Sequence, residues 1–312
     1  MNQFLKDVIK GLSSTDKYLE SKYFYDKKGD VLFQNIMASK EYYPTKCEME
    51  IFAAKTESLV KAITKHTQEF DIVELGAGDA TKSIHLLQAL VQAEYNFNYI
   101  PIDISKNVIT LLKNNLPKKV PELKVEGLNG EYFKMLEQVK NLSNKTKVVL
   151  FLGGNIGNVT LEKAESFCKE LRSHLNVGDI VIVGFDLKKD PKTILNAYND
   201  SAGFTRDFNL NLLNRINEEL KGDFNIENFY HYPVYDPSTG ATKSFLVSSE
   251  DQKVNIADMT FHFAKGEAVF MEISQKYRPE QTDNLAAISG FKPLDHLYDS
   301  KKWFLDTIWQ AV

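Results

Sequence analysis

The sequence predicts a doubly wound α/β fold, because two kinds of segment alternate along its middle part. Four short apolar runs, rich in β-branched and aromatic residues, end in turn or polar residues, as buried parallel strands do. They are FDIVEL (70–75), FNYIPIDIS (97–105), KVVLFLGG (147–154) and GDIVIVGFDL (178–187). Between them, residues 82–94, 106–116 and 161–174 carry apolar residues at helical spacing. Ligands of such sheets bind at the carboxyl ends of the strands.

The C-terminal third of the chain does not continue this alternation of predicted strands and helices. Residues 208–232 are predicted as a helix and its exit, with Gly222 as the stop signal. KSFLVSS, KVNIADMTFHF and EAVFMEISQKY are predicted strands, too many for one crossover connection, and indicate an accessory region with its own small sheet. The closing runs FKPLDHLYD and KWFLDTIWQ have no helix between them, so we expect a hairpin at the edge of the main sheet.

Composition and charge narrow the class of protein. The chain has 312 residues, with 38 basic and 42 acidic residues interleaved, and lacks the basic field that nucleic-acid binding requires. No apolar run has the length of a membrane span, and MNQFLKDVIKGLSS lacks the apolar region of a signal peptide. Cys47, Cys168 and the six scattered histidines form no disulfide or metal-ligand pattern. We expect a cytoplasmic protein with a small-molecule partner and no metal.

A glycine pair follows the first predicted strand, in the stretch VELGAGDATKS (73–83). Gly76 and Gly78 let the backbone approach a ligand closely because neither carries a Cβ atom. Dinucleotide sites have a third glycine, where helix and strand pack beneath the pyrophosphate, and Thr81 occupies that place here. The acids Glu74 and Asp79 would also repel a pyrophosphate and suit a cation. The loop therefore argues against an NAD-type cofactor.

A further acid, Asp103, ends the second strand in PIDIS, where a carboxylate can accept both hydroxyls of a ribose. S-adenosylmethionine combines a ribose with a sulfonium cation and has no phosphate, so it fits this pattern better than a dinucleotide. A plain helix-entry turn with solvated acids is the alternative.

Longer blocks of sequence extend this interpretation. They are YFYDKKGDVLFQNIMASKEYYPTKCEMEIF, ELGAGDATKS, PIDIS, LFLGGNIGN, GFDLKKD, NAYNDSAG, FNLNLLNRIN and VFMEISQKY. In this order, over nearly the whole chain, they resemble the S-adenosylmethionine-dependent histidine N-α-methyltransferases of ergothioneine biosynthesis. The resemblance implies a class I, Rossmann-like methyltransferase core at 60–188 plus 276–312. It also implies an interleaved α+β substrate-binding lobe at 1–59 plus 189–275.

The resemblance also implies which residues bind the methyl donor. Position by position, the donor residues are Gly76, Lys82, Asp103, Glu131, Tyr132 and Gly153. By likeness to the family, Gly76 lies beneath the methionine moiety and Asp103 holds the ribose. Glu131 and Tyr132 fall where the family has Asp-Phe or Asp-Tyr beside the adenine, and the longer Glu changes how that hydrogen bond is made.

The acceptor residues follow in the same way. They are Tyr43, Asn158, Tyr198, Phe208, Ser244, Glu272 and Ser274. The family's asparagine and tyrosine hold the amino and carboxylate groups of the amino acid, so Asn158, Tyr198 and Tyr43 are the predicted catalytic residues. Tyr43 and Phe208 are expected to line the space for the methylated cation with their π faces.

Local chemistry supports an imidazole beside Glu272 and Ser274. These residues are two apart on a predicted strand and point to one face, with Met271 and Ile273 on the other. A carboxylate and a hydroxyl together match the two ring nitrogens of histidine. Ser244 departs from the family, which has a methionine there, and this leaves the acceptor less certain than the donor.

The predicted reaction is in-line attack of the neutral α-amino nitrogen of histidine on the sulfonium methyl, repeated to the trimethyl betaine. Two alternatives stay open: a methyltransferase for another amino acid or amine, and a non-catalytic S-adenosylmethionine-binding protein. We expect a monomer.

Overall fold

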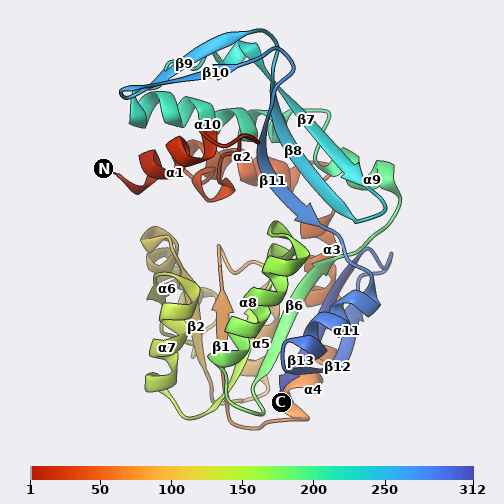
Figure 1. Ribbon diagram of the computed structural model, residues 1–312. Helices are drawn as coiled ribbons and strands as arrows, with labels where there is room; N and C mark the ends of the chain where they lie inside the picture. The colour runs from red at the N-terminus through yellow and green to blue at the C-terminus, as the bar shows by residue number, and fades with distance from the viewer. Residues whose placement is uncertain (1) are drawn as a thin grey trace. The chain divides into compact units, whose positions relative to one another are not determined.

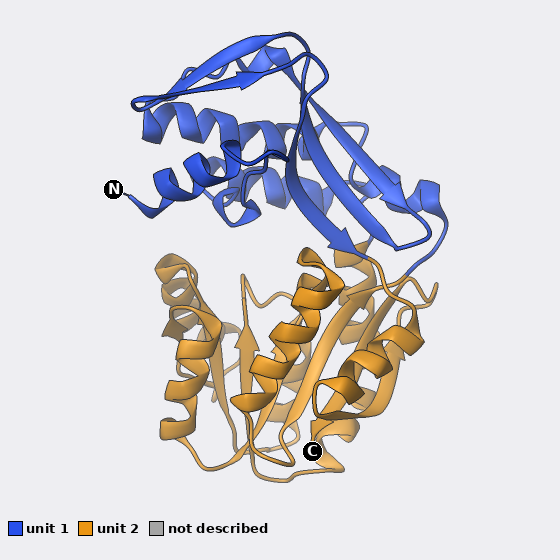
Figure 2. Ribbon diagram, in the orientation of Figure 1, with its two compact units in different colours: residues 1–43, 188–275 blue, residues 44–187, 276–312 orange. Residues whose placement is uncertain are grey.

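A computed structural model describes residues 2–312, and the chain forms two compact units (Figure 2). Residues 44–187 and 276–312 form the first, which we call the sheet unit. Residues 1–43 and 188–275 form the second, which we call the accessory unit. Each unit is assembled from two separate stretches of chain.

The sheet unit contains an eight-stranded sheet of order β12-β13-β6-β5-β1-β2-β3, with β4 paired to β2. Its strands are β1 (Phe70–Leu75), β2 (Asn98–Asp103), β3 (Lys124–Val125), β4 (Leu128–Asn129), β5 (Thr146–Phe151), β6 (Ile180–Asp186), β12 (Phe291–Tyr298) and β13 (Phe304–Ala311). The pairs β1/β2, β1/β5 and β5/β6 are parallel, whereas β13 runs antiparallel to β6 and β12. Every residue of β1 and β6 is buried, as expected of strands covered on both faces.

Helices cover both faces of this sheet. They are α3 (Pro44–Ala54), α4 (Thr56–Thr64), α5 (Ser83–Gln92), α6 (Lys106–Lys119), α7 (Tyr132–Leu142), α8 (Leu161–Ser173) and α11 (Pro279–Ile288), with the 3-10 turn η2 (Asn155–Asn158). Figure 1 shows α8 and α11 in front of the sheet and α3 and α5 behind it. The strand order reverses beside β1, and the crevice at such a switch point is where doubly wound sheets bind ligands.

The predicted doubly wound fold is confirmed. The four apolar runs are β1, β2, β5 and β6, and the glycine stretch joins β1 to α5. The two closing runs form the expected antiparallel hairpin, β12 and β13, at the edge of the sheet.

The N-terminal boundary of the sheet unit differs from the predicted one. Residues 44–59, assigned from sequence to the accessory lobe, belong to the sheet unit. The reason is packing, because α3 contacts β13 and α5, and α4 contacts α5. Residue 188 moves the other way, into the accessory unit.

The accessory unit combines helices with two small sheets. Its helices are α1 (Gln3–Leu12), α2 (Lys27–Ala38), α9 (Pro191–Ala197) and α10 (Phe204–Leu220), with the 3-10 turns η1 (Ser21–Tyr23) and η3 (Ile226–Asn228). A three-stranded antiparallel sheet has the order β11 (Ala268–Gln275), β8 (Ala241–Ser248), β7 (Phe229–Asp236), and β9 (Gln252–Ile256) pairs with β10 (Met259–Phe263). Helix α10 packs on α2 and on this three-stranded sheet.

Two details of the accessory unit correct the sequence prediction. Helix α10 begins at Phe204 rather than Phe208, and Lys221, not Gly222, takes the left-handed conformation at its end, with φ 57°. The predicted exit from this helix contains strand β7, whose interior Pro233 obscured its strand character. Because β7 lies at the edge of its sheet, proline is tolerated there.

Candidate functional site

Gly76 shapes the turn after β1. Its backbone has φ 70°, and its N–H donates to the carbonyl of Ile102 at 2.8 Å. A Cβ atom at this position would lie 2.7 Å from the hydroxyl oxygen of Tyr132. Both the conformation and the contact therefore require glycine.

Asp103 connects this turn to the end of β2. Its Oδ2 accepts the N–H of Gly78 at 3.3 Å, and its Oδ1 accepts the N–H of Ser105 at 2.8 Å. The side-chain amide of Asn129 donates to the carbonyls of Asp103 and Ile104, which fixes the corner. The carboxylate is only half-buried and keeps lone pairs for ligand hydroxyls.

The predicted adenine residues have different environments. Tyr132 is half-buried, and burial, together with the negative charge of Asp103, raises its pKa to about 12. Its ring packs edge-on against Phe151, 6.1 Å between centroids. Glu131 is exposed and pairs with Lys134 at 2.9 Å, an interaction that lowers the pKa of Glu131. Tyr132 therefore belongs to the packed wall of the site and Glu131 to its surface.

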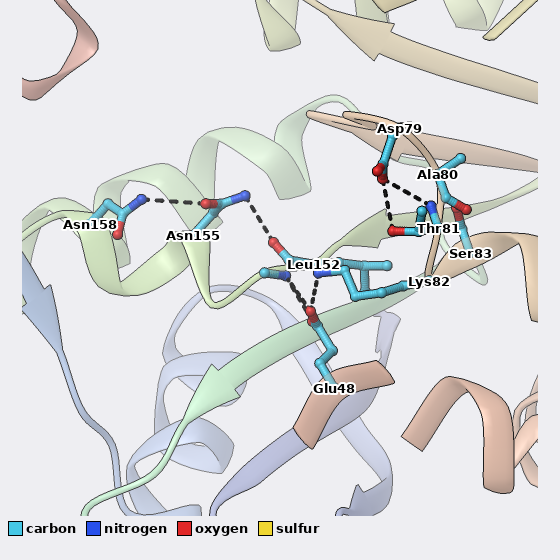
Figure 3. Close-up of polar contacts among 10 residues, drawn as sticks. Glu48, Asp79, Ala80, Thr81, Lys82, Ser83, Leu152, Asn155 and Asn158 are labelled. Carbon is cyan, nitrogen blue, oxygen red and sulfur yellow. Dashed lines mark hydrogen bonds and ion pairs between the residues drawn. The ribbon is translucent and has the colours of Figure 1, made fainter. Parts of the chain in front are cut away.

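Lys82 and Gly153 share one partner, Glu48 of α3 (Figure 3). The Lys82 ammonium forms an ion pair with the Glu48 carboxylate. The N–H of Gly153 donates to Oε1 and Oε2 of the same carboxylate, at 2.7 and 2.9 Å. Beyond Gly153, the amide of Asn158 donates to Asn155 Oδ1 at 3.3 Å, and Asn155 donates to the carbonyl of Leu152 at 2.9 Å.

Two further acids lie buried near Lys82. Burial raises the pKa of Glu74 to about 7, and the Tyr99 hydroxyl donates to its Oε2 at 2.6 Å. Asp306 of β13 is completely buried, and burial together with the adjacent Glu48 raises the pKa of Asp306 well above its ordinary value. The shift favours the protonated form of Asp306, which can donate a hydrogen bond.

The arrangement suits S-adenosylmethionine. Gly76 and Gly78 give the turn a bare backbone, and no atom lies within 4 Å of where a Cβ of Gly78 would be. Asp103 presents a partly open carboxylate to ribose hydroxyls, whereas Lys82 is neutralised by Glu48 and does not offer a pyrophosphate a bare cation.

The predicted acceptor residues of the accessory unit gather on one face of its three-stranded sheet. Antiparallel pairing puts Glu272 opposite Ser244, and Ser274 opposite Thr242, so all four side chains share a face. The Tyr198 hydroxyl donates to Ser274 Oγ at 2.7 Å. These contacts define a polar row, which consists of Thr242, Ser244, Glu272 and Ser274.

A bulge in β11 determines that Glu272 and Ser274 lie on the same face as Ser244 and Thr242. The register shifts between Phe270 and Glu272, so Met271 has no partner residue on β8. Strict alternation would place Met271 with Ile273, away from Glu272. Instead Met271 is 1 % exposed and lies in the apolar core with Val269.

Helix α10 contributes a residue that the sequence analysis missed. Asn209 is fully buried, and its Nδ2 contacts Glu272 Oε1 at 3.4 Å and donates to the Thr205 carbonyl at 2.9 Å. Five buried polar atoms of the accessory unit have no hydrogen-bond partner within the described chain: Thr205 Oγ1, Asn209 Oδ1, His231 Nε2, Thr242 Oγ1 and Ser244 Oγ. They all come from α10, β7 and β8.

Tyr43 and Phe208 already contact other side chains of the accessory unit, whereas the sequence analysis expected both to line the space for the methylated cation. Lys189 Nζ lies 4.1 Å from the ring centroid of Tyr43 and donates to its hydroxyl at 2.9 Å. Phe208 is 3 % exposed and packs against three aromatic rings, those of Phe24, Tyr25 and Phe33. Phe208 is therefore a core residue of the accessory unit, whereas Tyr43 already engages a cation with its π face.

The structure thus divides the predicted site residues by unit. The donor residues and Asn158 belong to the sheet unit, and the remaining acceptor residues belong to the accessory unit. Sequence analysis missed Glu48, Asp306 and Asn209. The signal for Glu48 was a lone acid among apolar residues in CEMEIF, and Asn209 stands in the amide-rich FNLNLLN.

Fold and donor site together define a class I, S-adenosylmethionine-dependent methyltransferase. Residues 4–311 match the sequence model described as histidine-specific methyltransferase, SAM-dependent, and the chain belongs to that family.

Curated relatives agree. The chain is 32 % identical to the histidine N-alpha-methyltransferase of Mycolicibacterium smegmatis, over 92 % of this chain and 88 % of the relative. It is 31 % identical to that of Mycobacterium tuberculosis, over 91 % and 88 %. A more distant relative, 25 % identical over 91 % of this chain and 87 % of its own, is the 4-dimethylallyltryptophan N-methyltransferase of Aspergillus fumigatus.

Among residues 2–312 no helix combines the length and apolar character needed to cross a membrane. Nor does this part of the chain bring three or more His, Cys, Asp or Glu side chains together as a metal site.

Proposed function

We propose that the chain methylates the α-amino group of L-histidine with S-adenosylmethionine and continues to the trimethyl betaine. The observation that carries the proposal is the polar row with Asn209 and Tyr198 beside it. Glu272 and Ser274 supply the acceptor and donor that imidazole nitrogens need, on the same face of the three-stranded sheet.

The residues act by binding and orientation. S-adenosylmethionine, when bound, supplies a methyl group on a sulfonium leaving group. In the proposal Gly76, Asp103 and Tyr132 hold the donor, while Asn158 and Tyr198 orient the amino nitrogen of histidine and Tyr43 borders the growing cation. Alignment of nitrogen, methyl and sulfur in a water-poor site then accounts for most of the rate. Because α-amino groups have pKa values near 8 in peptides, the site must select the neutral amine.

Calorimetry with S-adenosylhomocysteine followed by histidine tests this assignment. We expect the wild type to bind both and Glu272→Gln to bind histidine about tenfold or more weakly, as expected when a charged hydrogen-bond partner is lost. Glu218→Gln, an exposed carboxylate on α10, is the control and should bind histidine normally. Absence of histidine binding by the wild type would refute the assignment.

A second acceptor deserves the same screen because of Ser244. Serine is smaller than the family's methionine, and a relative is named for a prenylated tryptophan. Mass spectrometry of the twenty amino acids and simple amines, incubated with enzyme and S-adenosylmethionine, should show the gain of one to three methyl groups on histidine first. Preferential methylation of another amine would replace histidine as the substrate.

The oligomeric state and location also stay proposals. We expect a monomer in the cytoplasm, on the grounds of composition and cysteine content, and light scattering after gel filtration measures the first of these directly.

A further inference from the structure

A buried carboxylate joins two loops of the donor site. Glu48 is 0 % exposed, yet it belongs to α3, a helix that precedes the sheet in sequence. Its carboxylate accepts the N–H of Gly153, which follows β5, and pairs with Lys82, which ends the glycine turn after β1. β1 and β5 are neighbours in the sheet, and the strand order reverses beside them.

The sheet itself makes room for this carboxylate. At Gly184 of β6, a Cβ atom would lie 2.3 Å from Glu48 Oε1 and 3.2 Å from Asp306 Oδ1. The backbone of Gly184 does not have a positive φ, so the missing side chain, not conformational freedom, is what the position requires. Any larger residue would displace the acid pair.

The charges balance only if Asp306 keeps its proton. Two charged groups lie beside Asp306, Glu48 from α3 and Lys82 from the turn before α5. Glu74 from β1 interacts with Glu48 and Lys82. One ammonium cannot compensate two adjacent buried carboxylates, and neither carboxylate oxygen of Asp306 has a conventional partner in residues 2–312. If Asp306 keeps its proton, its hydroxyl can donate to Glu48, and the charge of Glu48 is then balanced by Lys82 alone.

We propose that Glu48 is a positioning residue of the donor site, which holds the Gly153 and Lys82 loops together, and that Asp306 fixes Glu48 as its neutral hydrogen-bond donor. This inference rests on the proposed donor site. Glu48 need not touch S-adenosylmethionine, because it acts through the backbone of Gly153 and the side chain of Lys82. A purely structural ion pair would instead change stability without changing donor affinity selectively.

Binding of S-adenosylhomocysteine by calorimetry separates these roles. Glu48→Gln should weaken binding about tenfold or more, as expected for disturbed contacts to a charged group. Glu50→Gln is the matched control, since Glu50 lies on the same helix, is exposed and only caps Ser300 at 2.8 Å. Glu50→Gln should bind like the wild type.

Asp306 supplies a rescue test. Asn at position 306 can still donate to Glu48, whereas Leu cannot. We therefore expect Asp306→Leu to lose donor affinity about tenfold and Asp306→Asn to stay within about threefold of the wild type. Equal affinities for the two variants would overturn the role of Asp306.

Hydrogen exchange of the wild type keeps the proposal testable if Glu48→Gln does not fold. The Gly153 amide should already exchange slowly, and saturating S-adenosylhomocysteine should slow it further together with Gly78. Rapid exchange at Gly153, or unchanged exchange on ligand binding, contradicts the proposal. If the wild type binds no S-adenosylhomocysteine, the proposed donor site falls and this inference with it; if Glu48→Gln binds normally, only this inference falls.

Discussion

The two units treat buried polar groups in opposite ways. In the sheet unit the buried carboxylate of Glu48 is engaged by the Lys82 ammonium and by the N–H of Gly153. In the accessory unit the buried groups on α10, β7 and β8 are neutral, and five of their atoms have no hydrogen-bond partner in the described chain. Unpartnered atoms of the sheet unit also exist, but they are scattered over β1, β13 and the flanks of α11.

The difference indicates two kinds of binding site. Charged groups that compensate each other make a rigid support whose geometry does not depend on a ligand. Polar atoms without partners cost free energy until a ligand or water engages them, so their concentration on one sheet face points to polar ligand recognition there.

Removing the charge of Lys82 should have the largest effect on stability. Lys82→Met leaves the buried carboxylate of Glu48 without its cation and should lower the free energy of unfolding by about 3–5 kcal/mol. The control is Lys169→Met, which breaks an exposed pair with Glu165 at 2.6 Å and should cost less than about 0.5 kcal/mol. Urea denaturation measures both. Equal small effects would mean that the buried cluster is not electrostatically coupled.

Glu74 should give the sheet unit a stability that falls with rising pH. Burial raises its folded pKa to about 7, against about 4.3 in an unfolded chain. The folded state therefore holds a proton that the unfolded state releases, and stability is lost between about pH 4.3 and 7, by up to about 4 kcal/mol. Glu74→Gln should flatten this slope in denaturation curves taken from pH 4.5 to 7.5. An unchanged slope would show that Glu74 is ionised in the folded protein.

His231 should give the accessory unit the opposite slope. Burial lowers its folded pKa to about 4, against about 6.5 unfolded. The unfolded chain then binds the extra proton, so stability falls as pH drops from 6.5 to 4, by up to about 3 kcal/mol. His231→Gln should remove this acid sensitivity, and exchange of accessory-unit amides reports it locally. The same loss of stability in the variant and the wild type would contradict the assignment.

The smallest effect concerns Ser244. Its hydroxyl is buried without a hydrogen-bond partner in the described chain. Ser244→Ala should therefore change the free energy of unfolding by less than about 1 kcal/mol, and we expect the variant to be slightly more stable than the wild type. Histidine binding should nevertheless weaken if the hydroxyl engages the ligand. Lys243→Ala, one residue away on the opposite, exposed face, controls for effects on the strand. A loss of several kcal/mol would reveal an internal partner.

Periodicity and turn chemistry were sufficient to predict the core of the fold. The four parallel strands, the closing hairpin and the glycine turn follow from local patterns, because burial on both faces enforces continuous apolar runs. The helix α10 ends at Leu220, two residues before the predicted stop Gly222, and the left-handed residue there is Lys221 rather than the glycine. The placement of residues 44–59 depends on helix packing, which local pattern does not encode.

For the candidate site too, the sequence predicted residues that lie in local patterns and missed residues that only the fold brings together. Residues in distinctive blocks, such as Asp103 and Ser274, were named from sequence. Glu48 and Asp306 were not, because one stands in a helix and the other in a strand that are remote along the chain. Only the fold brings them together beside Gly184.

The bulge at Met271 changes which residues of β11 face the interior of the accessory unit. The inward-facing residues before the bulge are apolar and those after it are polar. In an uninterrupted strand Met271 would take the place of Glu272 opposite Ser244, and Ile273 would take that of Ser274, so the sheet would present an apolar patch instead of an acid. Deleting Met271 would straighten the strand and still leave Glu272 facing inward. The side chains that this face presents thus depend on the register of β11. The register after the bulge survives the loss of Met271 better than the insertion of a further residue.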